Sequence, residues 1–410
     1  MSVLRDKTIV LGVSGGIAAY KAAEIVRLLV TAGAKVRVMM TRNAMEFITP
    51  LTLQTLSQNP VATDTFSLTQ ESEIGHIRLA DSADAILIAP ATADLIAKAA
   101  VGIADDLVTT VLLATRVKVT FAPAMNVKMY EHPTVVENIA KLRAHGVSIV
   151  EPGVGELACG YEGAGRLADP AIIVAEMERL LSARDFAAER ILVTAGPTQE
   201  AIDPVRFVSN RSSGKMGFAI ARAAWRRGAE VRVVAGPTAL ALPNGVERID
   251  AVSAAEMLEA TARNFPWCTA IVMAAAVADF RPARPARAKI KKDARGMTLE
   301  MEPIVDEMPR LAARKGTRLL VGFAAETGNL AANARDKLRR KHLDLIVAND
   351  VTQPGAGFGV DTNIVTLIGA DGRTQSHPQL SKDAVADLIL DRVAAIRVQK
   401  SKPARLRVVR

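Results

Sequence analysis

The chain contains a complete start of an α/β unit in its middle, and this feature constrains its architecture most. Ile191-Leu192-Val193 predicts a short buried strand, and a polar loop follows it as far as the glycine-containing segment 212–217. An apolar helical pattern comes next, over 218–225. A strand, a polar loop and a glycine-rich helix start are typical of a nucleotide phosphate site. The chain should therefore consist of two units that join near residue 186.

Length and composition favour two units of the same class. A chain of 410 residues exceeds what one hydrophobic core usually serves. Half of the residues are apolar and few are aromatic, which suits parallel strands buried on both faces. We predict an α/β protein with two doubly wound, three-layer domains of the Rossmann or flavodoxin type in tandem. They should occupy 1–189 and 190–400, with a basic tail at 401–410.

Several classes of protein are disfavoured. No apolar run approaches the ~20 residues that a membrane helix needs, and the first ten residues lack a signal peptide's apolar core. Two cysteines are too few for a disulfide framework, which favours a cytoplasmic location. The net charge of +9 comes from basic residues without interleaved aromatic ones, so small anionic substrates explain it as well as nucleic acid. We expect neither a membrane nor a nucleic-acid partner.

Small polar residues follow the predicted strands of the first half. Ser14-Gly15-Gly16 links a strand over 8–13 to a helix, and this turn suits a single phosphate more than a pyrophosphate. Ligands of parallel sheets bind at the carboxyl ends of strands, where Ser14, Thr41, Thr92 and Asn126 fall. These residues either line one crevice or cap the helices that follow, and the sequence leaves both alternatives open.

His76 and Cys159 are the other candidates of this half. A lone histidine is more often structural, but His76 could act as an acid or base if the fold brings it to the crevice. Cys159 lies among glycines, as expected of a mobile flap, whereas Cys268 beside Trp267 should be buried.

Four motifs of this half resemble the flavin-dependent cysteine decarboxylase family: GVSGGIAAYK, EIGHI, PAMNVKM and ACGYEGAGR. The resemblance implies a flavodoxin-like domain that forms trimers and uses FMN to stabilise the carbanion left by CO₂. It implies that His76 and Asn126 handle the cysteine moiety and its carboxylate, and that Cys159 donates a proton. Tyr130 stands where the family often has tryptophan. The residues implied in FMN binding are Ser14, Gly15, Gly16, Thr41 and Thr92.

In the second half, a long basic loop follows a buried strand over 270–278. It contains Lys289-Ile290-Lys291-Lys292 after three arginines. A charge run is usually a solvated face, but the length and position of this one favour a mobile loop that closes over a triphosphate. Lys337 and Lys341 share one face of a predicted helix and could add charge to the same site.

Five segments resemble the phosphopantothenate–cysteine ligase family in its bacterial, CTP-using form: TAGPTQEAIDPVRFVSNRSSGKMG, MAAAVADF, KIKK, GFAAET and LIVAND. The two halves together are similar to bifunctional phosphopantothenoylcysteine decarboxylase/ligases over nearly the whole chain. This resemblance implies that 4'-phosphopantothenate and L-cysteine are ligated through an acyl-cytidylate, with CTP and Mg²⁺. Decarboxylation to 4'-phosphopantetheine follows. Trimers of the first half and dimers of the second imply a homo-oligomer, a dodecamer.

The same resemblance assigns residues of the second half. Asn210 would stabilise the acyl-cytidylate, and Lys289 would grip the triphosphate and assist acyl transfer. Arg206, Asn210 and Ala276 would bind phosphopantothenate. The family usually has Pro-Asp-Ile where this chain has Pro303-Ile304-Val305. The residues implied around CTP are Ser212, Gly214, Met273, Ala274, Ala275, Asp279, Lys289, Pro303, Ile304, Val305, Phe323, Lys337 and Lys341.

A second hypothesis is a flavoprotein binding module or regulatory subunit with a vestigial ligase domain. The presence of His76, Asn126 and Cys159, and of Asn210 and Lys289, favours an enzyme. The sequence identifies no metal ligands.

Overall fold

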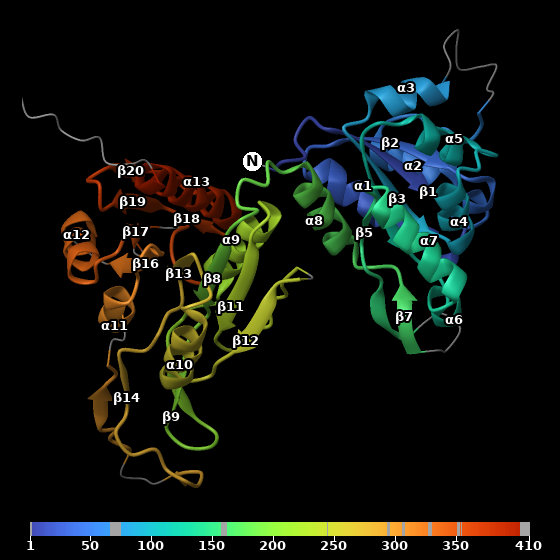
Figure 1. Cartoon of the computed structure of the whole chain (residues 1–410). Helices are drawn as coiled ribbons and strands as arrows, with labels where there is room; N and C mark the ends of the chain where they lie inside the picture. Colours follow the sequence, from blue (N-terminus) through green and yellow to red (C-terminus); the bar gives the residue numbers. More distant parts are fainter. Residues whose placement is uncertain are drawn as a thin grey trace, which may run out of the picture. The chain divides into compact units, whose positions relative to one another are not determined.

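The computed structural model divides the chain into two compact units, Met1–Ser182 and Ala183–Arg410 (Figure 1). The polar segment 183–189 belongs to the second unit. Phe186 is buried beneath the guanidinium of Arg227, 4.7 Å from its ring centre, and Arg227 also pairs with Asp185. No helix among the described residues is long and apolar enough to cross a membrane. The structure describes residues 2–65, 75–156, 162–243, 245–292, 296–305, 308–326, 330–350, 353 and 355–401, so most of the basic tail lies outside it.

The first unit is built on a five-stranded parallel sheet in the order β2-β1-β3-β4-β5. This is the flavodoxin-like order. The sheet grows to one side from β1 to β2 and to the other side from β3 onward, so the strand order reverses between β1 and β3. All seven residues of β3 are buried, because both faces of a parallel sheet are covered. The strands are β1 (Thr8–Val13), β2 (Lys35–Met40), β3 (Ala85–Ala91), β4 (Lys118–Pro123) and β5 (Ser148–Ile149), with a hairpin of β6 (Gly153–Glu156) and β7 (Glu162–Arg166).

Helices cover both faces of this sheet. One core contains Ile25 of α1, Leu53 of α2 and Ile173 of α8, and the opposite core contains Ile96 of α4 and Val108 of α5. The helical segments are η1 (Ile17–Lys21), α1 (Ala22–Thr31), η2 (Arg42–Glu46), α2 (Pro50–Ser57), α3 (Gly75–Ser82), α4 (Ala93–Val101), α5 (Leu107–Ala114), α6 (Val127–Tyr130), α7 (Pro133–Ala144) and α8 (Pro170–Leu181).

The second unit contains an eight-stranded sheet in the order β12-β11-β8-β13-β16-β17-β19-β20. Strands β12 to β17 are parallel, and the order reverses between β8 and β13. The predicted hairpin at Asp371-Gly372 forms β19 and β20, which are antiparallel. The α/β fold predicted for both halves is confirmed. The strands are β8 (Arg190–Ala195), β11 (Glu230–Ala235), β12 (Glu247–Asp250), β13 (Ala270–Met273), β16 (Leu319–Glu326), β17 (Leu345–Asp350), β19 (Val365–Gly369) and β20 (Thr374–Ser376).

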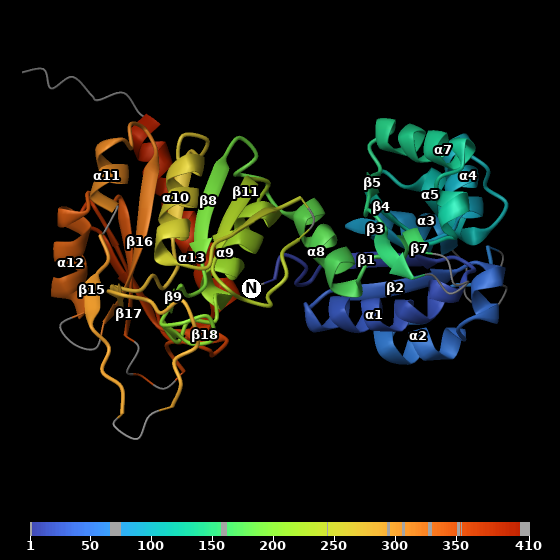
Figure 2. The ribbon, with the colours of Figure 1, turned by 90° about the horizontal axis from the view of Figure 1, so that it is seen from below.

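Two layers of helices enclose this sheet (Figure 2). Met257, Leu311 and Leu338 of α10, α11 and α12 share one core. On the other face α9 and α13 pack together, where Arg222 pairs with Asp383 at 2.9 Å. The helices are α9 (Lys215–Arg226), α10 (Ala254–Asn264), α11 (Met308–Ala313), α12 (Leu330–Arg340) and α13 (Lys382–Ser401). Short pairs complete the unit: β9 (Gln199–Ala201) with β10 (Phe207–Ser209), β14 (Phe280–Pro282) with β15 (Met301–Pro303), and β18 (Thr362–Asn363) with β21 (Leu380–Ser381).

Candidate active sites

The first unit has a cavity of about 1220 Å³ at the carboxyl ends of β1 and β3. This is the point where the strand order reverses, and ligands of open α/β sheets bind there. The structure brings Asn126 together with the five residues predicted to hold FMN. The lining includes Ser14, Gly15, Gly16, Thr41, Thr92 and Asn126.

The polar side chains of this lining also cap helical segments. The Thr41 hydroxyl accepts the Ala44 N–H at 3.3 Å, and the Thr92 hydroxyl accepts that of Leu95 at 3.4 Å. Asn126 Oδ1 accepts the N–H that follows at position 128, at 2.9 Å. Both alternatives left open by the sequence are therefore true of Thr41, Thr92 and Asn126: each caps a helical segment and also lines the cavity.

Ser14 joins the ends of β1 and β3. Its hydroxyl donates to the Pro90 carbonyl at 2.7 Å and accepts the Thr92 N–H at 3.0 Å. The residue is 2% exposed, and its own N–H also donates to Pro90. Because its hydrogens are used within the fold, Ser14 fixes the shape of the cavity wall rather than presenting a hydroxyl hydrogen.

The hairpin of β6 and β7 starts at the edge of this cavity. The Met125 N–H donates to the Gly165 carbonyl at 2.9 Å, and a Cβ on Gly165 would lie 2.4 Å from the Met125 oxygen. Gly165 and Arg166 line the cavity beside Asn126. Cys159 belongs to the segment 157–161 between these strands, which lies outside the described residues.

His76 is not among the described residues that line this cavity. It lies in α3, and its Nδ1 atom is buried without a hydrogen-bond partner in the described part of the chain. The fold of one chain therefore does not bring His76 to the crevice, which was the condition for its predicted role.

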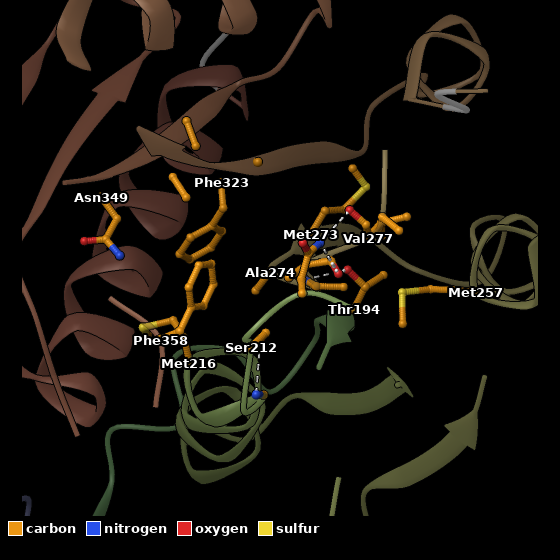
Figure 3. A pocket seen from close by; sticks show the side chains of 18 of the residues that line it. Thr194, Ser212, Met216, Met257, Met273, Ala274, Val277, Phe323, Asn349 and Phe358 are labelled. Atoms are coloured by element: carbon orange, nitrogen blue, oxygen red, sulfur yellow. Dashed lines mark hydrogen bonds between the residues drawn. The ribbon is translucent and has the colours of Figure 1, made fainter. Parts of the chain in front are cut away.

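The second unit has a cavity of about 560 Å³ at the carboxyl ends of β8, β13 and β16 (Figure 3). Figure 3 shows Phe323, Phe358 and Asn349 on one side of it and Thr194, Met273 and Ala274 on the other. The residues predicted around the nucleotide and substrate that line it are Asn210, Ser212, Gly214, Met273, Ala274, Ala275, Ala276, Asp279, Ile304, Val305, Phe323, Lys337 and Lys341.

Three predicted residues are not among those that line this cavity. Pro303 lines a neighbouring cavity of about 400 Å³, together with Ile304 and Val305. Lys289 and Arg206 line neither cavity. The Arg206 guanidinium instead contacts Asp203 and the carbonyl oxygen of Ile290.

A backbone segment after β13 forms the floor of this cavity. The sequence predicts a strand over 270–278, but β13 ends at Met273. The Ala275 N–H donates to the Thr194 hydroxyl at 3.3 Å, and the Ala278 N–H donates to that of Thr198 at 3.0 Å. The Ala274 and Ala276 N–H groups still donate to the carbonyls of Thr194 and Gly196, so the segment stays beside β8 and the loop after it. Its pairing with β16 ends at Met273, and side chains satisfy the N–H groups of Ala275 and Ala278 instead.

Glycines bring the start of α9 close to β8. Gly214 precedes the helix with φ of 79°, in the left-handed region that glycine adopts without strain. A Cβ on Gly217 would lie 2.5 Å from that of Ala195. The start of α9 therefore lies against the end of β8, and Gly214, Lys215 and Met216 line the cavity. A helix start suits an anion site.

Several polar residues of this cavity were not predicted from the sequence. Lys215 donates to the Gly359 carbonyl at 3.0 Å and to Asp361 at 2.7 Å. Burial and the nearby Lys215 lower the pKa of Lys382 against the opposing effect of Asp361. Buried Asn349 and Asn363 each have an Oδ1 atom without a partner in the described part of the chain. Asn349 lies in the segment LIVAND, which the resemblance already pointed to.

Cys268 is buried, as predicted. Its thiol donates to the Phe265 carbonyl at 3.3 Å, and burial raises the pKa of Cys268 to about 11. It is a structural cysteine.

Comparisons with known proteins match both halves. The model of the family described as Flavoprotein matches residues 2–182, and that of the DNA/pantothenate metabolism flavoprotein C-terminal domain matches 186–396. The chain is 49% identical to the coenzyme A biosynthesis bifunctional protein CoaBC of Bacillus subtilis over 401 residues, which cover 97% of this chain and 99% of the relative. It is 46% identical to the protein of that name from Escherichia coli strain K12 over 404 residues, with the same coverage.

Among solved structures, the chain resembles the C-terminal domain of a coenzyme A biosynthesis bifunctional protein CoaBC. The two are 41% identical, with a TM-score of 0.46, over 53% of this chain and all of that one.

Proposed function

Because this chain belongs to the family of coenzyme A biosynthesis bifunctional proteins, it is a phosphopantothenoylcysteine decarboxylase joined to a phosphopantothenate–cysteine ligase, and we propose how its two sites work. The predicted bifunctional enzyme is thus confirmed. One observation carries the assignment of sites: each unit has its own cavity at the point where its strand order reverses. The decarboxylase site then lies within 1–189 and the ligase site within 190–400.

The first unit is a flavoprotein domain, and its flavin is FMN. The cavity of about 1220 Å³ lies at the β1/β3 reversal, where flavodoxin-like sheets bind FMN, so the residues present fit this group. Gly15, Gly16, Thr41 and Thr92 hold the cofactor, and Ser14 fixes the wall behind it. When bound, the flavin supplies the electron sink for decarboxylation.

The protein's own groups orient the substrate of the decarboxylase. Asn126, at the cavity edge, holds the carboxylate that leaves, and its helix cap fixes its side chain. Cys159 supplies the proton. It lies in the sequence between β6 and β7, and Gly165 and Arg166, at the end of β7, line the cavity with Asn126.

His76 acts in a homo-oligomer. Since His76 does not line the cavity of its own chain, its contact with the cysteine moiety requires a second copy. Trimers of the first unit supply that copy, and dimers of the second unit complete a dodecamer. Light scattering on the purified protein measures this assembly, and a monomer with full decarboxylase activity would exclude the role of His76.

The second unit activates 4'-phosphopantothenate with CTP. The start of α9, at Ser212 and Gly214, binds phosphates, and Lys337 and Lys341 add positive charge. The base lies near Ala275, Ile304 and Val305, of which the last two stand where the family usually has Asp-Ile. Reaction of the substrate carboxylate with CTP forms an acyl-cytidylate and releases pyrophosphate. CMP is then the leaving group when the cysteine amine attacks, whereas a free carboxylate has no good leaving group.

The carboxyl group of the substrate meets the nucleotide at Asn210. Asn210, Ala276 and Arg206 bind phosphopantothenate, and the Asn210 amide stabilises the developing oxyanion. Lys289 reaches this site from the basic loop and assists acyl transfer to cysteine.

Mg²⁺ enters with the nucleotide. The described residues contain no group of three His, Cys, Asp or Glu side chains that could hold a metal. Asp279 alone offers a carboxylate to Mg²⁺ among the nucleotide-site residues assigned above. This set fits Mg²⁺, which is commonly held by one or two carboxylates and the phosphates of a substrate.

One experiment tests both sites. The purified protein is incubated with 4'-phosphopantothenate, L-cysteine, CTP and Mg²⁺, and the products are identified by mass spectrometry. We expect 4'-phosphopantetheine, CMP, pyrophosphate and CO₂, and FMN as the flavin released on denaturation. Equal ligase turnover with ATP would contradict the proposed use of CTP. A colourless protein that FMN does not reconstitute would contradict the proposed decarboxylase site. The enzyme works in the cytoplasm, where these small molecules are its partners.

A further inference from the structure

A buried carboxylate outside both cavities ties the basic loop to the β9–β10 hairpin. Asp203 is 3% exposed, and its carboxylate accepts five hydrogen bonds. The N–H groups of Val205 and Arg206 donate to Oδ1 at 2.8 Å each. The Ile290 N–H donates to Oδ2 at 3.1 Å, and Arg206 Nε donates to it at 3.0 Å. Such a set of charge-assisted bonds is strong and directional.

Arg206 contacts the same residue, Ile290, through its carbonyl group. Its Nη2 atom donates to the Ile290 carbonyl at 2.6 Å and to Asp203 at 2.5 Å. Residue 290 is therefore held through both its N–H and its carbonyl group. We call these three groups, the side chains of Asp203 and Arg206 and the backbone of Ile290, the latch.

The latch holds the loop where little else does. The described part of the loop leaves the β14–β15 pair after Pro282, and the Ala286 N–H donates to the Ile202 carbonyl at 2.9 Å. From 287 to 292 every residue is exposed except Ile290, which is half-buried. Ile290 directly follows Lys289, so the latch fixes the backbone from which the Lys289 side chain extends.

The charge state of Asp203 suits this role. Burial alone would raise the pKa of Asp203, but the N–H groups of Val205 and Ile290 and the Arg206 guanidinium outweigh it and hold that pKa far below its usual range. The carboxylate therefore stays ionised at neutral pH, and the latch persists while the loop carries its positive charges.

We propose that Asp203 is a positioning residue of the ligase, which together with Arg206 holds the Lys289 segment in the place from which Lys289 reaches the nucleotide. The proposal rests on the role proposed above for Lys289. It adds to the role of Arg206, because a guanidinium has five N–H donors and can hold Ile290 with some of them while others meet the substrate.

The first test is Asp203→Asn, which preserves the shape of the side chain and removes its charge. We expect the ligase kcat/KM for CTP to fall by roughly tenfold to a hundredfold, as loss of a charged hydrogen-bond acceptor implies. Amide hydrogen exchange should accelerate at 287–292. Decarboxylase turnover and flavin content in the same protein should not change. Arg287→Gln, in the same loop but outside the latch, is the matched control.

A double-mutant cycle separates positioning from general stability. If Asp203 acts through Lys289, then Asp203→Asn costs little further activity in a Lys289→Ala background. Equal losses in both backgrounds, or unchanged exchange at 287–292, would overturn the proposal. A Lys289→Ala variant with full ligase activity would instead refute the proposed role of Lys289, while the exchange data still report the latch.

A second variant acts from the loop side if Asp203→Asn unfolds the unit. Ile290→Pro removes the N–H that Asp203 accepts and leaves both charged side chains in place. We expect the same loss of ligase activity and the same faster exchange at the flanking residues, with decarboxylase turnover retained. Wild-type ligase kinetics in Ile290→Pro would contradict the latch.

Discussion

The side-chain nitrogen of Asn210 donates a hydrogen bond to the carbonyl oxygen of Ala276 at 3.1 Å. The same nitrogen donates to the Val277 carbonyl, also at 3.1 Å. Asn210 thus holds the backbone that follows β13, in addition to lining the cavity. In its proposed role, Asn210 would exchange one of these carbonyl partners for the acyl-cytidylate.

Asn210→Asp should abolish amide-bond formation and spare decarboxylation. A carboxylate cannot donate to the two carbonyl oxygens and repels them, so the cavity floor shifts and the oxyanion donor is lost. Removal of one oxyanion donor typically costs about 10²- to 10³-fold in kcat. Separate assays of ligation, and of decarboxylation from supplied 4'-phosphopantothenoylcysteine, measure the two effects. Loss of both activities would argue against independent sites.

Ser14→Ala should destabilise the first unit and weaken flavin retention. The substitution leaves the Pro90 carbonyl and the Thr92 N–H without the hydroxyl that joins them. Loss of such buried partners costs about 1–3 kcal/mol. Thermal unfolding and the flavin content after gel filtration measure the outcome. For unfolding free energy alone, Thr92→Ala is the comparison, since it removes a helix cap but keeps the Ser14 link to Pro90. An equal loss of unfolding free energy in both variants would contradict a larger structural role for Ser14.

Gly15→Ala should give a colourless first unit, whereas Gly16→Ala should pack normally. A Cβ on Gly15 would lie 2.3 Å from that of Asn43 and 2.7 Å from its backbone carbon, so the segment after Thr41 must move. The nearest atom to a Cβ on Gly16 is Thr92 Cγ2, at 3.5 Å. The visible absorption of the two purified variants tests the difference, and a yellow Gly15→Ala protein would contradict it.

Strand ends and their polar residues could be predicted because they depend on local pattern. The apolar run 270–278 could not reveal that β13 stops at Met273, since Asn210 and Thr194 decide this from distant positions. Lys382 joins the second cavity from the start of α13, and Asn363 joins it from β18. No local spacing relates such residues, so only the folded topology assembles them.

The acid sensitivity of the second unit should depend on Asp203. Its folded pKa lies below the unfolded value of about 3.9, so its contribution to stability is present above pH 3.9 and is lost as the pH falls toward the folded pKa. The difference in unfolding free energy between wild type and Asp203→Asn should stay constant from pH 7 to about 5. It should shrink below pH 4. Urea unfolding from pH 7 to below pH 4 measures this difference in unfolding free energy. A difference that grows as the pH falls would contradict the lowered pKa of Asp203.

Cys159→Ser should stall decarboxylation after CO₂ release and leave ligation intact. The variant retains Cys268 as its one thiol, and this thiol cannot replace the proton donor because it is buried and bonded to Phe265. With a pKa of about 11, Cys268 is almost entirely protonated at pH 8, so a thiol reagent should label the native variant far more slowly than the unfolded one. Mass spectrometry follows both the oxidised enethiol product and the label. Unaltered turnover would remove Cys159 from the mechanism, and fast labelling would show that Cys268 is accessible.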